Sequence, residues 1–394
     1  MPETSPPSAP RERQHLYWLD WVRFLAAFGV LAAHTREFNW DGFAAYTGQE
    51  NSPALALFIS LFSLGRQAVV VFFVLSGWLV GGYAIERVRA GTFDLAGYAA
   101  DRLSRVYVPL VPALLFTLAV VRGLDAPVDL RQYLVCLVGL QNVTSIRMPG
   151  ANGALWTLAY EIWFYVLTGC AAVACRRRGA GWSRLLGVAG AAVAVWVCVA
   201  LGWVYLACWL VGAAGGWLRG RLSPGARPWV AAAGALVMAG GSAIYQIDKG
   251  VLPSPSAGFA LPASGLAQLI VAAGALLLVA SVSDLAPRTG VGRRIERAGG
   301  WLAAFSYTLY LVHFPVLGAL RVCLGTLPPV MTAFAVGRAL ASATLCVVVA
   351  LGLYALFERQ TPQVRRWLRA RFGGEASPQP RPAPAGAPAL AART

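Results

Sequence analysis

Long apolar stretches dominate the chain, and shorter segments rich in arginine separate them. A helix needs about 20 apolar residues to cross the hydrocarbon core of a bilayer. Several of the stretches reach that length, and the others come close to it. The pattern therefore predicts an all-α, polytopic membrane helix bundle of about ten transmembrane helices, at about residues 17–36, 66–84, 106–122, 155–175, 185–200, 203–218, 228–246, 264–283, 301–321 and 332–357.

Positive charge falls in every second loop of this arrangement. Cytoplasmic loops of membrane proteins carry an excess of lysine and arginine, whereas the opposite loops are poor in both. Ten spans therefore place both termini in the cytoplasm, together with all the arginine-rich segments. These segments are residues 87–105, 176–184, 219–227, 288–297 and 359–371.

Two apolar segments do not fit the count of ten. Residues 130–143 are too short to cross, and counting them would reverse every later loop, so we expect a re-entrant or interfacial element. Residues 53–64 are expected to pack outside the second span. The remaining division is a disordered segment at 1–15, a membrane domain at 16–358, and a cytoplasmic tail at 359–394 that is first basic and then rich in Ala and Pro.

Composition agrees with a membrane protein and argues against the main soluble alternative. Of 394 residues, 58% are hydrophobic and 13% are charged, and the net charge is +16. Such a charge would suggest nucleic acid in a soluble protein, but here the arginines lie between apolar runs, so no nucleic acid partner is expected. The seven cysteines lie mostly inside apolar runs without metal-ligand spacing, and no metal site is expected.

The first predicted span carries ionisable residues inside an apolar helix. Asp20 and Arg23 stand near its start and His34 near its end. Arg23 and His34 are 11 residues apart, which places them on nearly the same face and about 16 Å apart along the axis. A charged group inside a membrane costs at least about 2.5–3.5 kcal/mol and usually has a function. The alternative is a histidine that a neighbouring helix satisfies.

The second span and the loop after it contain two further candidates. Ser76 and Gly77, in FFVLSG, offer a hydroxyl and a surface without a Cβ, where another helix or a thin ligand chain can approach. Plain packing of small residues is the alternative. Arg102 and Arg105 are spaced i and i+3 and suit a phosphate or pyrophosphate. Their alternative role is to anchor the cytoplasmic end of a span.

Polar residues also occur inside the fourth and ninth spans. Glu161 lies within an aromatic apolar segment, where a carboxylate needs an ion-pair partner or a proton. Ser306, Tyr310 and His313 follow an i, i+4, i+7 pattern and form a polar stripe on one helix face. A bundle that brings these features together has a polar interior, which serves either transport or chemistry.

Five motifs, taken together and in order, resemble the integral-membrane acyltransferase type-three family, which are acyl-CoA-dependent O-acyltransferases. The resemblance covers about residues 16–357. The matching motifs are LDWVRFLAAFGVLAAH, FFVLSGW, Arg102-x-x-Arg105 before Tyr107 and Pro109, WTLAYE, and SYTLYLVHFPV.

The resemblance implies transfer of an acyl group, commonly acetyl, from cytoplasmic acyl-CoA to a hydroxyl of a sugar-containing acceptor. A surface glycan, a lipid-linked sugar and a secondary metabolite all remain open as acceptors. His34 corresponds to the family's essential histidine, with Arg23 as its arginine partner, and would act as a general base or as a transient acyl carrier. Glu161 is the second expected catalytic residue, which would set the tautomer of the imidazole or share the proton. The expected donor-binding residues are Arg23, Arg102, Arg105, Ser76 and Gly77, and the expected acceptor-binding or supporting residues are Asp20, Trp156, Ser306, Tyr310 and His313.

This hypothesis needs no permanently bound cofactor, since acyl-CoA is a co-substrate. The expected partners are acyl-CoA, the hydroxylated acceptor and the lipid bilayer, and a homo-oligomer is left open. The expected location is the bacterial cytoplasmic (inner) membrane, crossed many times. The main alternative is a proton-coupled transporter or exporter of a glycan or small polar solute, because embedded His, Glu and Arg suit a proton path. The sequence shows no inverted repeat in support of it.

Overall fold

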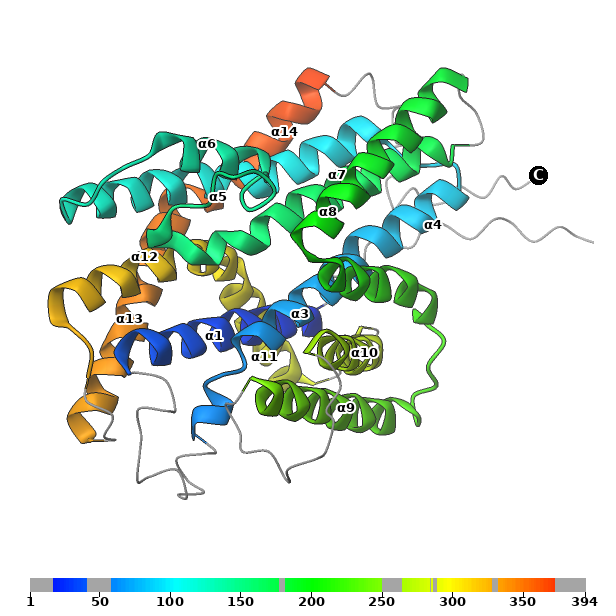
Figure 1. The fold of residues 1–394 in the computed structure, drawn as a ribbon. Helices are drawn as coiled ribbons and strands as arrows, with labels where there is room; N and C mark the ends of the chain where they lie inside the picture. The colour runs from blue at the N-terminus through cyan, green and yellow to red at the C-terminus, as the bar shows by residue number, and fades with distance from the viewer. Residues whose placement is uncertain are drawn as a thin grey trace, which may run out of the picture.

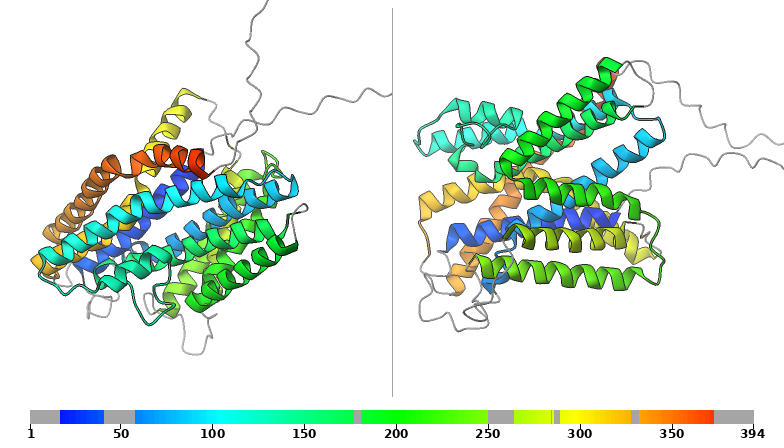
Figure 2. Two further views of the ribbon diagram at one scale, coloured as in Figure 1. Left: turned by 90° about the horizontal axis from the view of Figure 1, so that it is seen from above. Right: turned by 45° about the vertical axis from the view of Figure 1, so that its right-hand side comes forward.

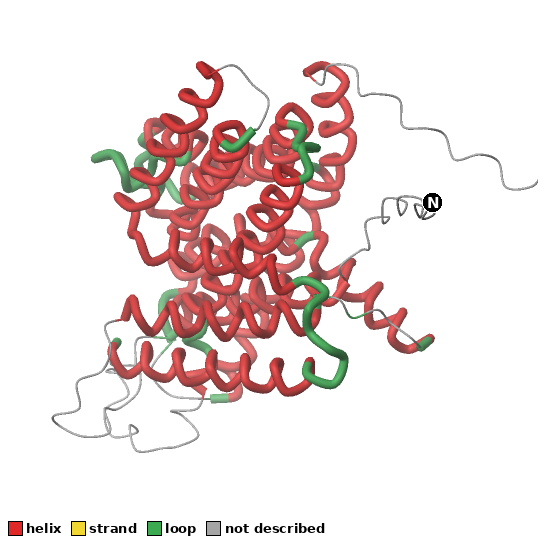
Figure 3. Tube along the Cα trace, turned by 90° about the vertical axis from the view of Figure 1, so that its right-hand side faces the viewer, coloured by secondary structure: helices red, strands yellow, loops and turns green. Residues whose placement is uncertain are grey.

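The computed structural model describes residues 17–40, 58–176, 181–249, 264–283, 285, 289–327 and 332–372. This part of the chain consists of helices joined by loops, with one isolated β-bridge between Trp40 and Leu327 (Figures 1 and 3). The all-α membrane bundle is confirmed. The predicted disordered segment 1–15 and the Ala/Pro-rich residues 373–394 lie outside the described residues.

The helices follow one another in the order drawn in Figure 1. They are α1 (Tyr17–Asn39), α3 (Gly65–Ser76), the π-helical turn η2 (Gly77–Gly82), α4 (Tyr83–Arg89), α5 (Leu95–Gly123), α6 (Leu130–Val138), η3 (Gly150–Leu155), α7 (Trp156–Ala174), α8 (Gly181–Gly215), η4 (Gly216–Leu218), α9 (Arg227–Asp248), α10 (Ser264–Val282), α11 (Gly290–Ala304), α12 (Ser306–Leu324), α13 (Ala333–Leu356), η5 (Glu358–Gln360) and α14 (Thr361–Phe372).

Eight helical segments of the described chain are long and apolar enough to cross a membrane. Helix α1 is not one of them, since Asp20, Arg23 and His34 interrupt its apolar sequence. Helix α8 counts once, although its backbone leaves the helical conformation at Gly202, where φ is 137°. That conformation favours glycine, and the bend falls between the two predicted spans at 185–200 and 203–218. The count of ten and the cytoplasmic side of both termini stay predictions.

Two predicted boundaries need correction. The ninth span, expected at about 301–321, joins the end of α11 to the start of α12, and the chain leaves the helix at Phe305 between them. The hydroxyl of Ser306 donates to the carbonyl of Ala303 across this break at 2.8 Å. The third span was expected to start at residue 106. The helix that contains it starts at Leu95 instead, because polar residues before the apolar run are also helical.

The short apolar segment predicted at 130–143 forms α6, which spans about 13 Å and is too short to cross a bilayer. The Tyr107 hydroxyl donates to the carbonyl of Leu137 at 2.7 Å and so ties α6 to α5. The second segment outside the count of ten was 53–64, of which the structure describes residues 58–64. There Ile59 is buried in a small cluster with Trp40 and Leu327, beside the start of α3.

Helix α3 occupies the centre of the bundle and positions the polar residues around it. It contacts α1, α8 and α10, and most of its side chains are buried. Helix α12 packs against α1, α5, α13 and η3. Figure 2 shows α14 lying across the first half of α5, so that a segment close to the C-terminus covers the region beside α12. These contacts enclose a cavity between α1, α3, α5, α7, α12 and α14.

Candidate active site

The cavity has a volume of about 340 Å³ and is lined by cationic, aromatic and hydroxyl-bearing side chains. Many of the residues singled out from the sequence meet here, although they come from five different helices. Their individual roles stay predictions. The sequence-predicted residues that line the cavity are Arg23, Ser76, Arg102, Arg105, Glu161, Ser306 and Tyr310.

Aromatic rings hold the two arginines of α5. The guanidinium of Arg102 lies 5.2 Å from the ring centre of Tyr165, and that of Arg105 lies 6.0 Å from the ring centre of Tyr307. At these distances a cation is attracted to the face of the ring. Tyr165 in turn donates its hydroxyl proton to Glu161 Oε1 at 2.6 Å. The cavity therefore presents guanidinium groups whose orientation is set by stacking.

Arg23 differs from the two arginines of α5 because a carboxylate on its own helix partly neutralises it. Its Nη1 donates to Asp20 Oδ1 at 3.1 Å, three residues earlier on α1. Both side chains are mostly buried. Asp20 therefore supports Arg23 at the cavity wall.

Three buried polar atoms of the cavity lining have no hydrogen-bond partner among the described residues. They are the hydroxyl of Ser76, Nε of Arg102 and the hydroxyl of Tyr307. Buried polar groups in proteins are nearly always hydrogen-bonded, because an unpaired one loses its interaction with water. These three atoms belong to residues that line one cavity, so polar groups beside it are left for a ligand or ordered water to satisfy.

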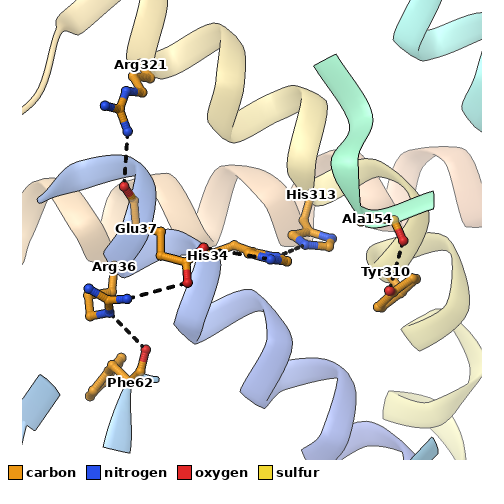
Figure 4. A network of polar contacts seen from close by, with 8 residues as sticks. All are labelled: His34, Arg36, Glu37, Phe62, Ala154, Tyr310, His313 and Arg321. Atoms are coloured by element: carbon orange, nitrogen blue, oxygen red, sulfur yellow. Dashed lines mark hydrogen bonds and ion pairs between the residues drawn. The ribbon is translucent and has the colours of Figure 1, made fainter. Parts of the chain in front are cut away.

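The histidine of α1 pairs with the histidine of α12 (Figure 4). Nδ1 of His34 lies 2.7 Å from Nε2 of His313, and Nδ1 of His313 lies 3.0 Å from the carbonyl of Leu309. A carbonyl only accepts, so Nδ1 of His313 is the donor in that contact. With both rings neutral, Nε2 of His313 then accepts the Nδ1 proton of His34. The remaining lone pair of His34 is on Nε2, which faces away from His313.

The surroundings of the two imidazoles differ. His313 is 1% exposed, whereas the His34 side chain keeps 20% exposure. Among the described residues, the carboxylate nearest to Nε2 of His34 is that of Glu37, at 4.0 Å. The carboxylate of Glu161 lines the cavity and pairs with Tyr165 instead. The structure therefore gives His34 a histidine partner, where the sequence suggested Glu161.

Tyr310 stands between the cavity and the histidine pair. Its side chain lines the cavity, whereas neither imidazole does. The Tyr310 ring centre is 5.8 Å from that of His313. Its hydroxyl lies 2.7 Å from the Thr157 hydroxyl and donates to the carbonyl of Ala154 at 3.0 Å. Tyr310 therefore adjoins both the cavity and His313.

Gly77 and Trp156, like Asp20 and the two histidines, do not line the cavity. Gly77, the first residue of η2, faces α8, where a Cβ would overlap the carbonyl oxygen of Trp209, so its small size permits close packing of this turn on α8. The helix-packing alternative accounts for Gly77, and the structure does not bring it to the cavity. Trp156 lies under the guanidinium of Arg66 at 5.2 Å, and Nη1 of Arg66 donates to the Tyr205 hydroxyl at 2.7 Å.

The cavity also includes residues that the sequence did not single out. Tyr165 follows Glu161 by four residues, so the helical spacing could have indicated it. Tyr307 adjoins the polar stripe of α12 but lies off its i, i+4, i+7 pattern. Arg365 belongs to the basic segment after the last span, where no spacing distinguishes one arginine from the next.

In the part of the chain that is described, no three His, Cys, Asp or Glu side chains cluster. None of the seven cysteines, all within that part, forms a disulfide. Four of them are buried, namely Cys136, Cys198, Cys208 and Cys346.

These features define a multi-pass helical membrane protein with a cation-lined cavity inside the bundle. The family described as the acyltransferase domain matches residues 16–355. The chain therefore belongs to the type-three family of membrane acyltransferases, and its activity is acyl transfer. Searches of curated proteins and of solved structures found no match.

Proposed function

We propose that this acyltransferase moves an acyl group, acetyl in the simplest case, from cytoplasmic acyl-CoA to a hydroxyl of a sugar-containing acceptor. The observation that carries the proposal is the arginine-lined cavity with its three unpartnered buried polar atoms. Arginine is well suited to phosphate groups, since its planar donors bind their oxygens in pairs. Acyl-CoA carries a pyrophosphate, and it acts as a co-substrate that leaves after each turnover.

The donor is held by the residues of α5 and α3. Arg102 and Arg105 bind the pyrophosphate, because their guanidinium groups are oriented by stacking and are not paired with Asp20 as Arg23 is. The Ser76 hydroxyl, unpartnered and buried, faces the pantetheine arm. The acyl end then reaches His34 past the ring of Tyr310, which requires movement of that side chain.

His34 acts as the general base. Its Nε2 takes the proton of the acceptor hydroxyl while the hydroxyl oxygen attacks the thioester carbonyl. The carbon–sulfur bond breaks, and the imidazolium returns the proton to the departing CoA thiolate. Throughout the reaction, Nε2 of His313 accepts a hydrogen bond from Nδ1–H of His34. This bond stabilises the imidazolium cation that forms on His34. A transient acyl group on Nε2 of His34 is the alternative path, with the same donor and acceptor.

The position of His34 favours an acceptor outside the cytoplasm. It lies near the C-terminal end of α1, about 16 Å along the axis from Arg23 and away from the predicted cytoplasmic end. A surface glycan or a lipid-linked sugar is accessible from that side. We therefore place the protein in the bacterial cytoplasmic membrane, with the donor entering from the cytoplasm.

The test uses inside-out membrane vesicles that contain the protein and its native glycans, supplied with [14C]acetyl-CoA. We expect label in the glycan fraction with the natural sequence and none with His34→Ala. Phe28→Leu is the matched control, because Phe28 lies on the same helix and is exposed. Full labelling with His34→Ala in normally inserted protein would refute the role of His34. A proton-coupled transporter, the alternative function, would neither bind CoA nor transfer label.

A further inference from the structure

The C-terminal helix α14 contributes to the wall of the cavity, although it follows the last membrane-crossing run. Thr361 and Arg365 of this helix line the cavity together with Asp101, Arg102 and Arg105 of α5. Helix α14 packs directly on α5 (Figure 2). The cavity is therefore completed by a segment outside the family's matched region, which ends at residue 355.

A carboxylate of α5 holds α14 in place. Nη2 of Arg369 lies 2.8 Å from each oxygen of Asp101, and its Nε lies 3.1 Å from Oδ1. Nε of Arg365 lies 3.9 Å from the same carboxylate, beyond hydrogen-bonding distance. Asp101 is thus satisfied by Arg369, and Arg365 retains donors for another anion. The Arg365 side chain is 45% exposed, so solvent and ligands reach it.

A second contact fixes the start of α14. The carboxylate of Glu358, in η5, accepts hydrogen bonds from the backbone N–H of Thr308 at 3.2 Å and from its hydroxyl at 2.5 Å. The Thr361 hydroxyl donates to the carbonyl of Glu358 at 2.6 Å. These bonds join the beginning of α14 to α12. With Asp101 and Glu358 as anchors, the helix holds Arg365 at the cavity instead of moving freely.

The cations of the cavity follow an order along α5. Asp101 precedes Arg105 by four residues, which corresponds to about 6 Å along the helix axis. Because Arg365 is beside Asp101, it lies about one helical turn from Arg105 toward the predicted cytoplasmic side, at the level of Asp101 and Arg102. CoA also has an outer anion. Its ribose carries a 3′-phosphate, which lies beyond the pyrophosphate at the end away from the thioester.

We infer that Arg365 binds the 3′-phosphate of CoA and that α14 forms the outer wall of the donor site. This inference rests on the proposed function, because it assigns the donor to this cavity. It makes α14 a specificity element, through which the enzyme distinguishes CoA from donors that carry only a pyrophosphate.

The test compares binding of CoA and of 3′-dephospho-CoA to the full-length protein in lipid nanodiscs, by calorimetric titration. Arg365→Gln removes the charge, Arg365→Lys keeps it, and Arg366→Gln is the matched control one position along the helix. Arg366 is exposed and does not line the cavity. We expect Arg365→Gln to raise the Kd of CoA about tenfold, the usual loss for one charge-assisted hydrogen bond. The Kd of 3′-dephospho-CoA should stay unchanged, and Arg365→Lys should restore part of the CoA affinity.

The inference would be overturned if Arg365→Gln raised the Kd of CoA and of 3′-dephospho-CoA equally, or if it left the Kd of CoA unchanged. The same holds if Arg366→Gln matches the effect of Arg365→Gln. Binding of CoA without acyl transfer from acetyl-CoA would refute the proposed function while the comparison of the two ligands still decides the role of Arg365. No binding of CoA by the natural sequence would refute both.

Discussion

Replacement of His313 by leucine tests the proposed division of roles between the two imidazoles. Nε2 of His313 lies 2.7 Å from Nδ1 of His34, and His313 itself is 1% exposed. Leucine fills a similar space but cannot accept a hydrogen bond, so the Nδ1–H of His34 loses its hydrogen-bond partner inside the bundle. The backbone carbonyl of Leu309 also loses the His313 side chain, but it keeps its place in the helix.

The expected size of the effect follows from the cost of an unsatisfied buried donor, which is about 1–3 kcal/mol. If this cost falls on the transition state, where His34 becomes a cation, kcat drops by about 5- to 150-fold. The KM for acetyl-CoA should change little, because neither imidazole lines the arginine cavity. His313 would therefore act as a positioning residue for His34.

The assay measures initial rates over a range of acetyl-CoA concentrations with the natural protein, His313→Leu and His313→Gln. Glutamine offers a carbonyl oxygen to Nδ1 of His34 and should restore most of kcat. Thermal unfolding in detergent shows whether each variant is folded. The reasoning is refuted if folded His313→Leu keeps its full kcat, if its KM for the donor rises instead, or if glutamine is as damaging as leucine.

Two further predictions concern stability, measured by thermal unfolding in detergent. Gly77→Ala should lower the free energy of unfolding by roughly 1–3 kcal/mol, because the new Cβ would overlap the carbonyl of Trp209, a form of overpacking. Gly123→Ala is the control, since a Cβ there meets nothing within 4 Å, and equal midpoints for the two variants would contradict the prediction. Asn152→Ala should cost roughly 1–3 kcal/mol, because Nδ2 of Asn152 donates to the Thr117 hydroxyl at 3.0 Å and thereby joins η3 to α5. An unchanged midpoint would show that this buried hydrogen bond adds nothing.

The positions of several helices could be predicted closely from the sequence. The run predicted at 264–283 forms α10 (Ser264–Val282), and the run predicted at 332–357 forms α13 (Ala333–Leu356). Both are mainly apolar stretches bounded by polar or turn-forming residues, so local hydropathy and length decide where the helix lies. The start of the ninth span was misplaced, since the helix breaks at Phe305, inside a run that hydropathy predicts as one segment.

Which residues line the cavity could be predicted only in part. Arg102, Glu161 and Tyr310 stand out because polar residues are rare in or beside apolar helices, and they do meet at one cavity. Gly77 stood out equally, yet it packs against α8. A small residue next to a serine has the same local pattern whether it faces a ligand or a helix. Only the rotation of α3 about its axis separates the two.

The partners of these residues depended on the tertiary structure alone. His34 and His313 are 279 residues apart, and nothing in either segment indicates that one ring accepts from the other. Arg365 reaches the cavity because α14 packs on α5, where Asp101 binds Arg369. Hydropathy is a property of each segment, and it indicated which segments are apolar and long enough to cross a membrane. Which side chains face each other depends on how two helices pack together, so it is decided only when the bundle assembles.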